Sequence, residues 1–124
     1  MHVDYYRVKG KIKLGFADES KKIELALSPD MFREIEGMVC CTDYSSGKAV
    51  INNLMQFNEV ILNYYSGSIG KLEWKLEESL KNIIDSGIFV VNGEIVVTDS
   101  MSKDNDFVIT IKDNEVVKEK KSFR

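Results

Sequence analysis

The sequence predicts a single α+β domain in which an antiparallel sheet of about four to six strands packs against two or three central helices. Three observations support this class. β-prone segments lie near both ends of the chain, helical periodicity fills its middle, and the 124 residues contain one proline and no low-complexity segment. Strands grouped before and after helices favour α+β over alternating βαβ units. We therefore expect one domain over residues 1–124, which is long enough for one core without disulfides or metals.

An N-terminal hairpin is expected first. Apolar and basic side chains alternate between residues 6 and 16, which is the period of a strand with one buried face. The apolar side holds Tyr6, Val8, Ile12, Leu14 and Phe16. Residues 17–20 predict a turn, and the alternation then resumes at Ile23, Leu25 and Leu27. The two strands would pair antiparallel and bury one face.

Three helical segments are expected in the middle of the chain. Ser28 and Pro29 predict the start of a short helix that ends near Gly37, and residues 38–46 fit either a loop or a short strand. Residues 48–65 carry one apolar stripe, formed by Val50, Leu54, Phe57, Ile61 and Tyr64. Residues 69–86 carry a second stripe and are followed by a stop at Gly87; the stripe is formed by Ile69, Leu72, Leu76, Leu80 and Ile83.

Two hairpins are expected in the C-terminal part. Asn92-Gly93 separates two β-prone runs within residues 88–98, and this dipeptide favours a type I′ turn. Such a hairpin would be aliphatic on one face, which indicates a central position in the sheet. A further hairpin would turn at Asp113-Asn114, and the basic tail, residues 118–124, is expected to fray.

Groups suited to catalysis are scarce. The one histidine, His2, lies next to the start of the chain, where a side chain is seldom held rigidly enough to act as base or ligand. Cys40 and Cys41 are adjacent, which suits packed residues in a reducing cytoplasm better than zinc ligands or a disulfide. Asp104-Asn105-Asp106 lacks the spacing of a calcium loop and favours a solvated turn. We therefore expect no catalytic residues, no metal site, no cofactor and no enzymatic activity.

Composition narrows the class of partner. The chain carries 17 basic and 20 acidic residues, for a net charge of −3, which disfavours nucleic acid and anionic membranes as partners. No apolar run approaches the roughly 20 residues of a membrane helix, and the first residues lack the basic-then-apolar pattern of a signal peptide. We expect a cytoplasmic protein without a membrane partner.

The first candidate surface is basic. Arg7, Lys9, Lys11 and Lys13 share one face of the first predicted strand and could touch phosphates. Edge-strand lysines that prevent aggregation explain the same pattern better, because the rest of the chain is acidic.

The second candidate surface surrounds Trp74. On a helical wheel this residue lies about 150° from the apolar stripe of residues 69–86, and its neighbours there include Glu77, Glu78 and Asp85. A tryptophan among carboxylates is typical of a contact with a basic protein surface. Burial of Trp74 beneath another segment is the more frequent arrangement for a large aromatic residue.

The favoured hypothesis is a small non-enzymatic protein-binding module that occludes a partner with a basic surface through Trp74, Glu77, Glu78 and Asp85. Bacterial immunity proteins, which sequester a toxin in the cytoplasm, have this size and acidity, so a toxin inhibitor is one form of the hypothesis. The alternative is a winged-helix nucleic-acid binder that uses helices over 48–65 and 69–86 and the hairpin over 88–98. The carboxylates of the second helix oppose it. A homodimer is compatible with either hypothesis.

Overall fold

A five-stranded antiparallel sheet with one long helix on one of its faces dominates the structure. The computed structural model describes residues 6–21, 30–31, 33–35, 59–66 and 69–122, and for residues 64, 66 and 69–74 it describes the backbone alone. The elements, in chain order, are strand β1 (Tyr6–Phe16), strand β2 (Glu59–Ser66), helix α4 (Ile69–Asp85), strand β3 (Phe89–Asp99), the 3-10 turn η1 (Lys103–Asn105), strand β4 (Phe107–Lys112) and strand β5 (Glu115–Lys120).

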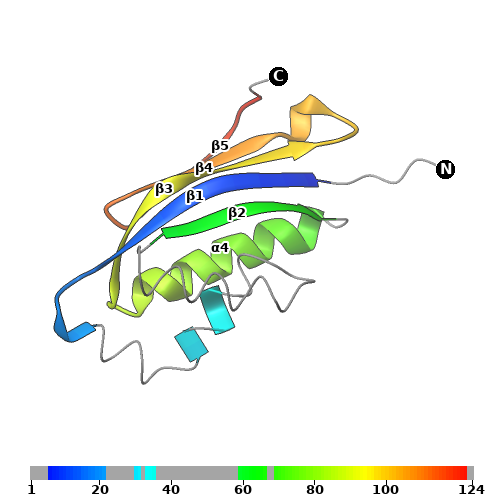
Figure 1. Cartoon of the computed structure of the whole chain (residues 1–124). Coiled ribbons are helices and arrows are strands. Elements are labelled where there is room, and N and C mark those ends of the chain that lie inside the picture. Colours follow the sequence, from blue (N-terminus) through cyan, green and yellow to red (C-terminus); the bar gives the residue numbers. More distant parts are fainter. Residues whose placement is uncertain (1–5, 22–29, 32, 36–58, 67–68, 123–124) are drawn as a thin grey trace.

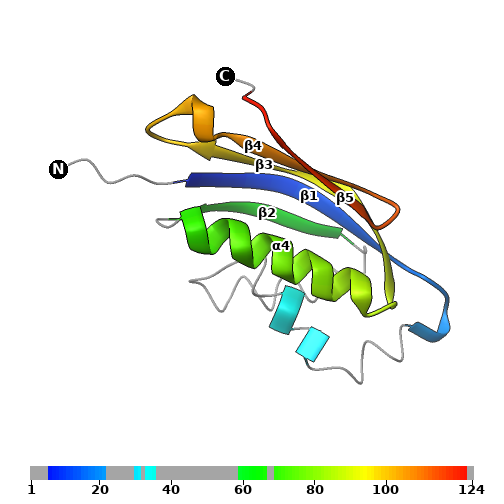
Figure 2. The same cartoon turned by 180° about the vertical axis from the view of Figure 1, so that it is seen from behind.

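The sheet has the strand order β2-β1-β3-β4-β5, and each neighbouring pair is antiparallel. β1 pairs with β2 on one side and with β3 on the other, along its whole length in the second case. Figures 1 and 2 show that β1 and β3 bend toward the side on which α4 lies. The sheet therefore curves around the helix.

The core lies between the sheet and α4. Alternate residues of β1 are buried, as are residues of α4, and the helix lies along one side of the sheet (Figure 1). Ile35 is also fully buried in this core, and Met31 packs against it. The largest fully buried side chains are Phe89, Phe107, Ile12, Leu14, Ile35, Leu62, Leu76, Leu80 and Ile83. Burial of these apolar groups supplies most of the driving force for folding.

The expected packing of the sheet against two or three central helices is wrong. α4 is the one α-helix whose bounds the described residues give. Of the helix expected over residues 48–65, residues 59–65 belong to β2, and residues 48–58 lie outside the described part. Val60 and Leu62 of β2 are buried while Ile61 between them is exposed, which is the period of a strand. The apolar residues of this segment have helical spacing, but its β-prone residues form a strand that pairs with β1.

The hairpin expected over residues 88–98 is also wrong. β3 runs without a break from Phe89 to Asp99 and passes straight through Asn92 and Gly93. Both of its halves pair with the single strand β1, so the two halves never face each other. The expected N-terminal hairpin is wrong as well, because β2 and β3 occupy the two sides of β1. Residues 23–27, its expected second strand, lie outside the described part.

The helix over residues 69–86 and the last hairpin are confirmed. α4 spans Ile69–Asp85, and Gly87 follows it at a φ of 71°. β4 and β5 turn at Asp113 and Asn114, both of which have positive φ, as a type I′ turn requires.

The tail expected to fray is held in place as far as Ser122. β5 extends to Lys120, the N–H of Lys121 donates to the carbonyl of Asp106, and Ser122 Oγ donates to the Asp106 carboxylate. These two bonds tie Lys121 and Ser122 to the start of β4.

Candidate binding face

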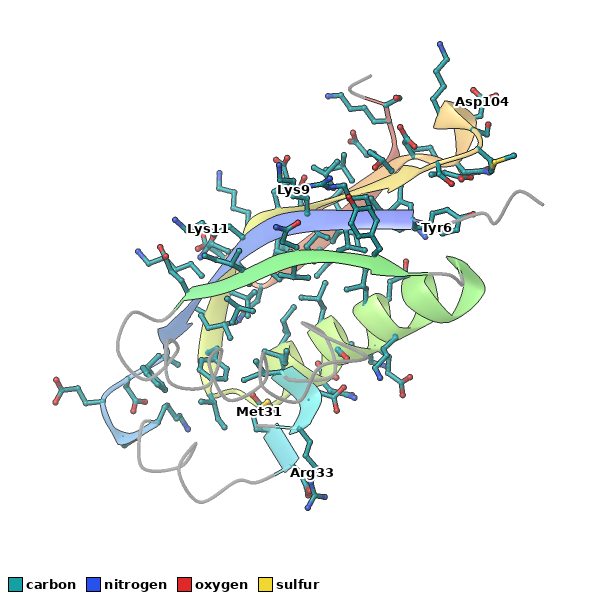
Figure 3. All side chains as sticks on the ribbon, turned by 45° about the vertical axis from the view of Figure 1, so that its right-hand side comes forward. Tyr6, Lys9, Lys11, Met31, Arg33 and Asp104 are labelled. Carbon is teal, nitrogen blue, oxygen red and sulfur yellow. The ribbon has the colours of Figure 1, made fainter. Side chains whose placement is uncertain are left out.

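The sheet face turned away from α4 is the strongest candidate site. We call it the open face, because no element of the described residues crosses it (Figures 1 and 2). It carries the basic side of β1 together with alternate residues of the neighbouring strands. Those neighbours include Glu59, Ile61, Asn63 and Tyr65 of β2 and Asn92, Glu94, Val96 and Thr98 of β3. Figure 3 shows Lys9 and Lys11 on this side of β1.

The strand register places these side chains in rows across the sheet. Lys9 lies between Asn63 of β2 and Val96 of β3, while Lys11 lies between Ile61 and Glu94. Directly opposed residues on one face have Cβ atoms about 5 Å apart. Cations of one strand are therefore interleaved with apolar and acidic side chains of the next strands.

A shallow hollow lies at the centre of the open face. Its volume is about 670 Å³, and its lining comes from β1, β2 and β3 alone. The residues that line it are Arg7, Lys9, Gly10, Lys11, Ile61, Leu62, Asn63, Glu94, Val96 and Thr98. Three cations and one carboxylate thus surround a floor to which Ile61 and Val96 contribute apolar surface.

Two of the three cations in the hollow already have partners. Arg7 donates to the hydroxyl of Tyr65 at 2.7 Å, and its guanidinium carbon lies 5.3 Å from the centre of the Tyr65 ring. Lys11 Nζ lies 3.2 Å from a carboxylate oxygen of Glu59. Lys9 is exposed, and no carboxylate of the described residues lies within salt-bridge distance of it. Lys9 is therefore the cation of the hollow that is ready to bind an incoming anion.

Part of the open face was predicted and part was missed. The alternation in β1 correctly placed Arg7, Lys9, Lys11 and Lys13 on one face. β1, however, lies inside the sheet, so protection of a sheet edge does not explain its lysines. Ile61 and Tyr65 were missed because their segment was expected to be helical, although its β-branched and aromatic residues were a usable signal for a strand.

The predicted site on α4 is less acidic in the structure than in the sequence. Glu77, Glu78 and Asp85 are exposed. Lys118 of β5 lies 3.1 Å from Glu77, so this carboxylate is partly neutralised. The side chain of Trp74 lies outside the described part, and its predicted role stays a prediction.

Two buried carboxylates, Asp99 at the end of β3 and Asp106 just before β4, serve the fold. Asp106 accepts hydrogen bonds at 2.8 Å from the backbone N–H of Asp99 and from Ser122 Oγ. Asp99 accepts them from the N–H of Met101 at 2.9 Å and from Asn105 Nδ2 at 2.8 Å. The turn expected to be solvated at residues 104–106 is exposed at its first two positions only, since Asp106 is buried. Within the described residues, no group of His, Cys, Asp and Glu side chains could hold a metal ion.

Comparison with known proteins assigns no family or function to the chain. No family model, no curated protein and no solved structure matches the chain. Among the described residues, no helix is long and apolar enough to cross a membrane.

Proposed function

We propose that this chain is a non-enzymatic binding protein that covers the surface of a partner protein with its open face. One observation carries the proposal: a hollow in a sheet face combines exposed apolar side chains with a cation that no described carboxylate neutralises. Ile61 is 58% exposed and Tyr65 is 60% exposed on that face. Large exposed apolar side chains rimmed by polar groups are characteristic of protein-interaction sites.

The fold weighs against the winged-helix alternative. That architecture needs a helix over 48–65 and a hairpin over 88–98. Residues 59–66 are a strand of the sheet, and residues 89–99 form one continuous strand. Among the described residues, neither a helix pair nor a wing is present where that function would require it, so we do not propose it.

Occlusion of a toxin by an immunity-type inhibitor is one form of the proposed function. Such a protein needs a rigid surface and no catalytic group, and an open sheet face offers a surface of this kind. Action in the cytoplasm is part of this proposal, because the adjacent cysteines suit a reducing compartment. A toxin gene beside the gene for this chain would support it.

Affinity capture from the native host, with matched variants, tests the proposed function. The double variant Ile61→Gln/Tyr65→Gln removes apolar surface from the open face. Met101→Gln removes a side chain that is 59% exposed in the β3–β4 loop. If one residue of the pair anchors the partner, the double variant should weaken capture by about tenfold or more, and Met101→Gln should leave it unchanged. Equal capture of a partner by all three proteins would contradict the proposal.

A further inference from the structure

We infer that the hollow binds an acidic segment of its protein partner, with a carboxylate of that segment on Lys9 and separate aliphatic side chains against Ile61 and Val96. This inference rests on the proposed function and adds the chemistry of the partner. It also reverses the charge expected from the sequence, where the acidic side of α4 predicted a basic partner.

The charges around Lys9 carry the first step. Arg7 is bound to Tyr65 and Lys11 to Glu59, whereas Lys9 has uncharged neighbours on both sides, Asn63 and Val96. A carboxylate placed on Lys9 would form a new ion pair without breaking an existing one. Arg7, whose partner is the Tyr65 hydroxyl and not a carboxylate, adds to the attraction, whereas the charge of Lys11 is offset by Glu59 and Glu94.

The apolar lining carries the second step. Ile61 is the cross-strand partner of Lys11, and Val96 is the cross-strand partner of Lys9. These two aliphatic groups therefore lie on either side of the β1 cations, within reach of one extended segment that crosses the strand. Because Ile61 is 58% exposed, covering it removes apolar surface from water.

The same face is poorly suited to nucleic acid. Binding of single strands relies on aromatic rings on which bases stack. Tyr65, the aromatic residue that the described part places on this face, already has its ring against the Arg7 guanidinium. A polypeptide with alternating acidic and aliphatic side chains can contact both the Lys9 cation and the apolar surface of Ile61 and Val96.

Binding of labelled probes, followed by fluorescence anisotropy, tests the inference. The probes are a short peptide of alternating Glu and Leu, the same peptide with Lys in place of Glu, and an oligothymidylate. We expect the Glu–Leu peptide to bind and added salt to weaken it. Lys9→Glu should weaken it by about fivefold, the upper end of the range for one exposed ion pair, because the reversed charge also repels the peptide. Lys75→Glu, an exposed substitution on α4, is the matched control and should bind as the wild type does.

Three results would overturn the inference: no binding of the Glu–Leu peptide, equal binding to Lys9→Glu, or tighter binding of the Lys–Leu peptide or the oligonucleotide. Capture of the native partner separates this failure from failure of the proposed function. A partner lost with Ile61→Gln/Tyr65→Gln but kept with Lys9→Glu would support the open face and reject the acidic segment. A partner kept with both variants would reject the open face itself.

Discussion

Gly93 shows how one residue lets two central strands lie together. Its φ is 152°, a backbone conformation that residues with side chains rarely adopt. A Cβ added there would lie 2.2 Å from the carbonyl oxygen of Lys11 in β1. The glycine that suggested a turn in the sequence therefore serves a different purpose, which is the close approach of β3 to β1.

Substitution of Gly93 should be among the most damaging changes in the sheet. Gly93→Ala should lower the free energy of unfolding by about 3 kcal/mol or more, because strain adds to a backbone clash. Gly15→Ala is the control, since its added Cβ meets no atom nearer than 3.7 Å, and we expect a change below about 1 kcal/mol. Chemical denaturation of both variants measures the difference. Similar midpoints for the two would show that the strands can separate at Gly93 without cost.

At the scale of elements, the helix and the turn that depend on neighbouring residues were predicted correctly. The strands that depend on pairing with a distant part of the chain were not. α4 and the turn at residues 113–114 depend on periodicity, a stop and turn-forming residues, all of which are local. β2 is held in the sheet by its pairing with β1, which lies more than 40 residues away, and no local pattern in the sequence predicts that pairing. The open face could not be predicted as a whole for the same reason, because it exists only when β1, β2 and β3 lie side by side.

The turn at Asp113 and Asn114 has a second role that makes a test possible. Asn114 Oδ1 accepts a hydrogen bond at 2.7 Å from the N–H of Val91, which ties the β4–β5 turn to β3. Asn114→Gly keeps the positive φ but leaves this amide without its acceptor, so the free energy of unfolding should fall by about 1–3 kcal/mol.

Asp113→Gly is the control, because it relieves a φ of 46° and leaves the bond to Val91 in place. Its thermal midpoint should equal or exceed that of the wild type, while that of Asn114→Gly should fall. If both glycine variants lost the same stability, the bond from Asn114 to Val91 would contribute nothing measurable.

At the scale of the whole molecule, β1 connects the fold to the proposed function. One side of the strand supplies Val8, Ile12 and Leu14 to the core, and the other side supplies the cations of the open face. Its pairing with β3 joins residues that are far apart in sequence, from Phe16 with Phe89 to Tyr6 with Asp99. Such non-local pairing is slow to form, but it produces a strand held from both sides. A binding face built on the interior of a sheet is therefore rigid, which lowers the entropic cost of docking a partner.

Hydrogen exchange measured by NMR tests this rigidity directly. Amides of β1, β3 and β4 should be the most protected, because these strands have neighbours on each side, whereas β5 lies at an edge. Protection should also alternate along β5. In a two-residue hairpin the residues next to the turn exchange hydrogen bonds, so the amides of Val117 and Glu119 point toward β4 and those of Val116 and Lys120 point away. We expect the first pair to exchange at least about tenfold more slowly than the second. Uniform exchange along β5 would contradict its pairing with β4. β1 amides that exchange as fast as those of β5 would show that the sheet opens from its centre and that the open face is not a rigid surface.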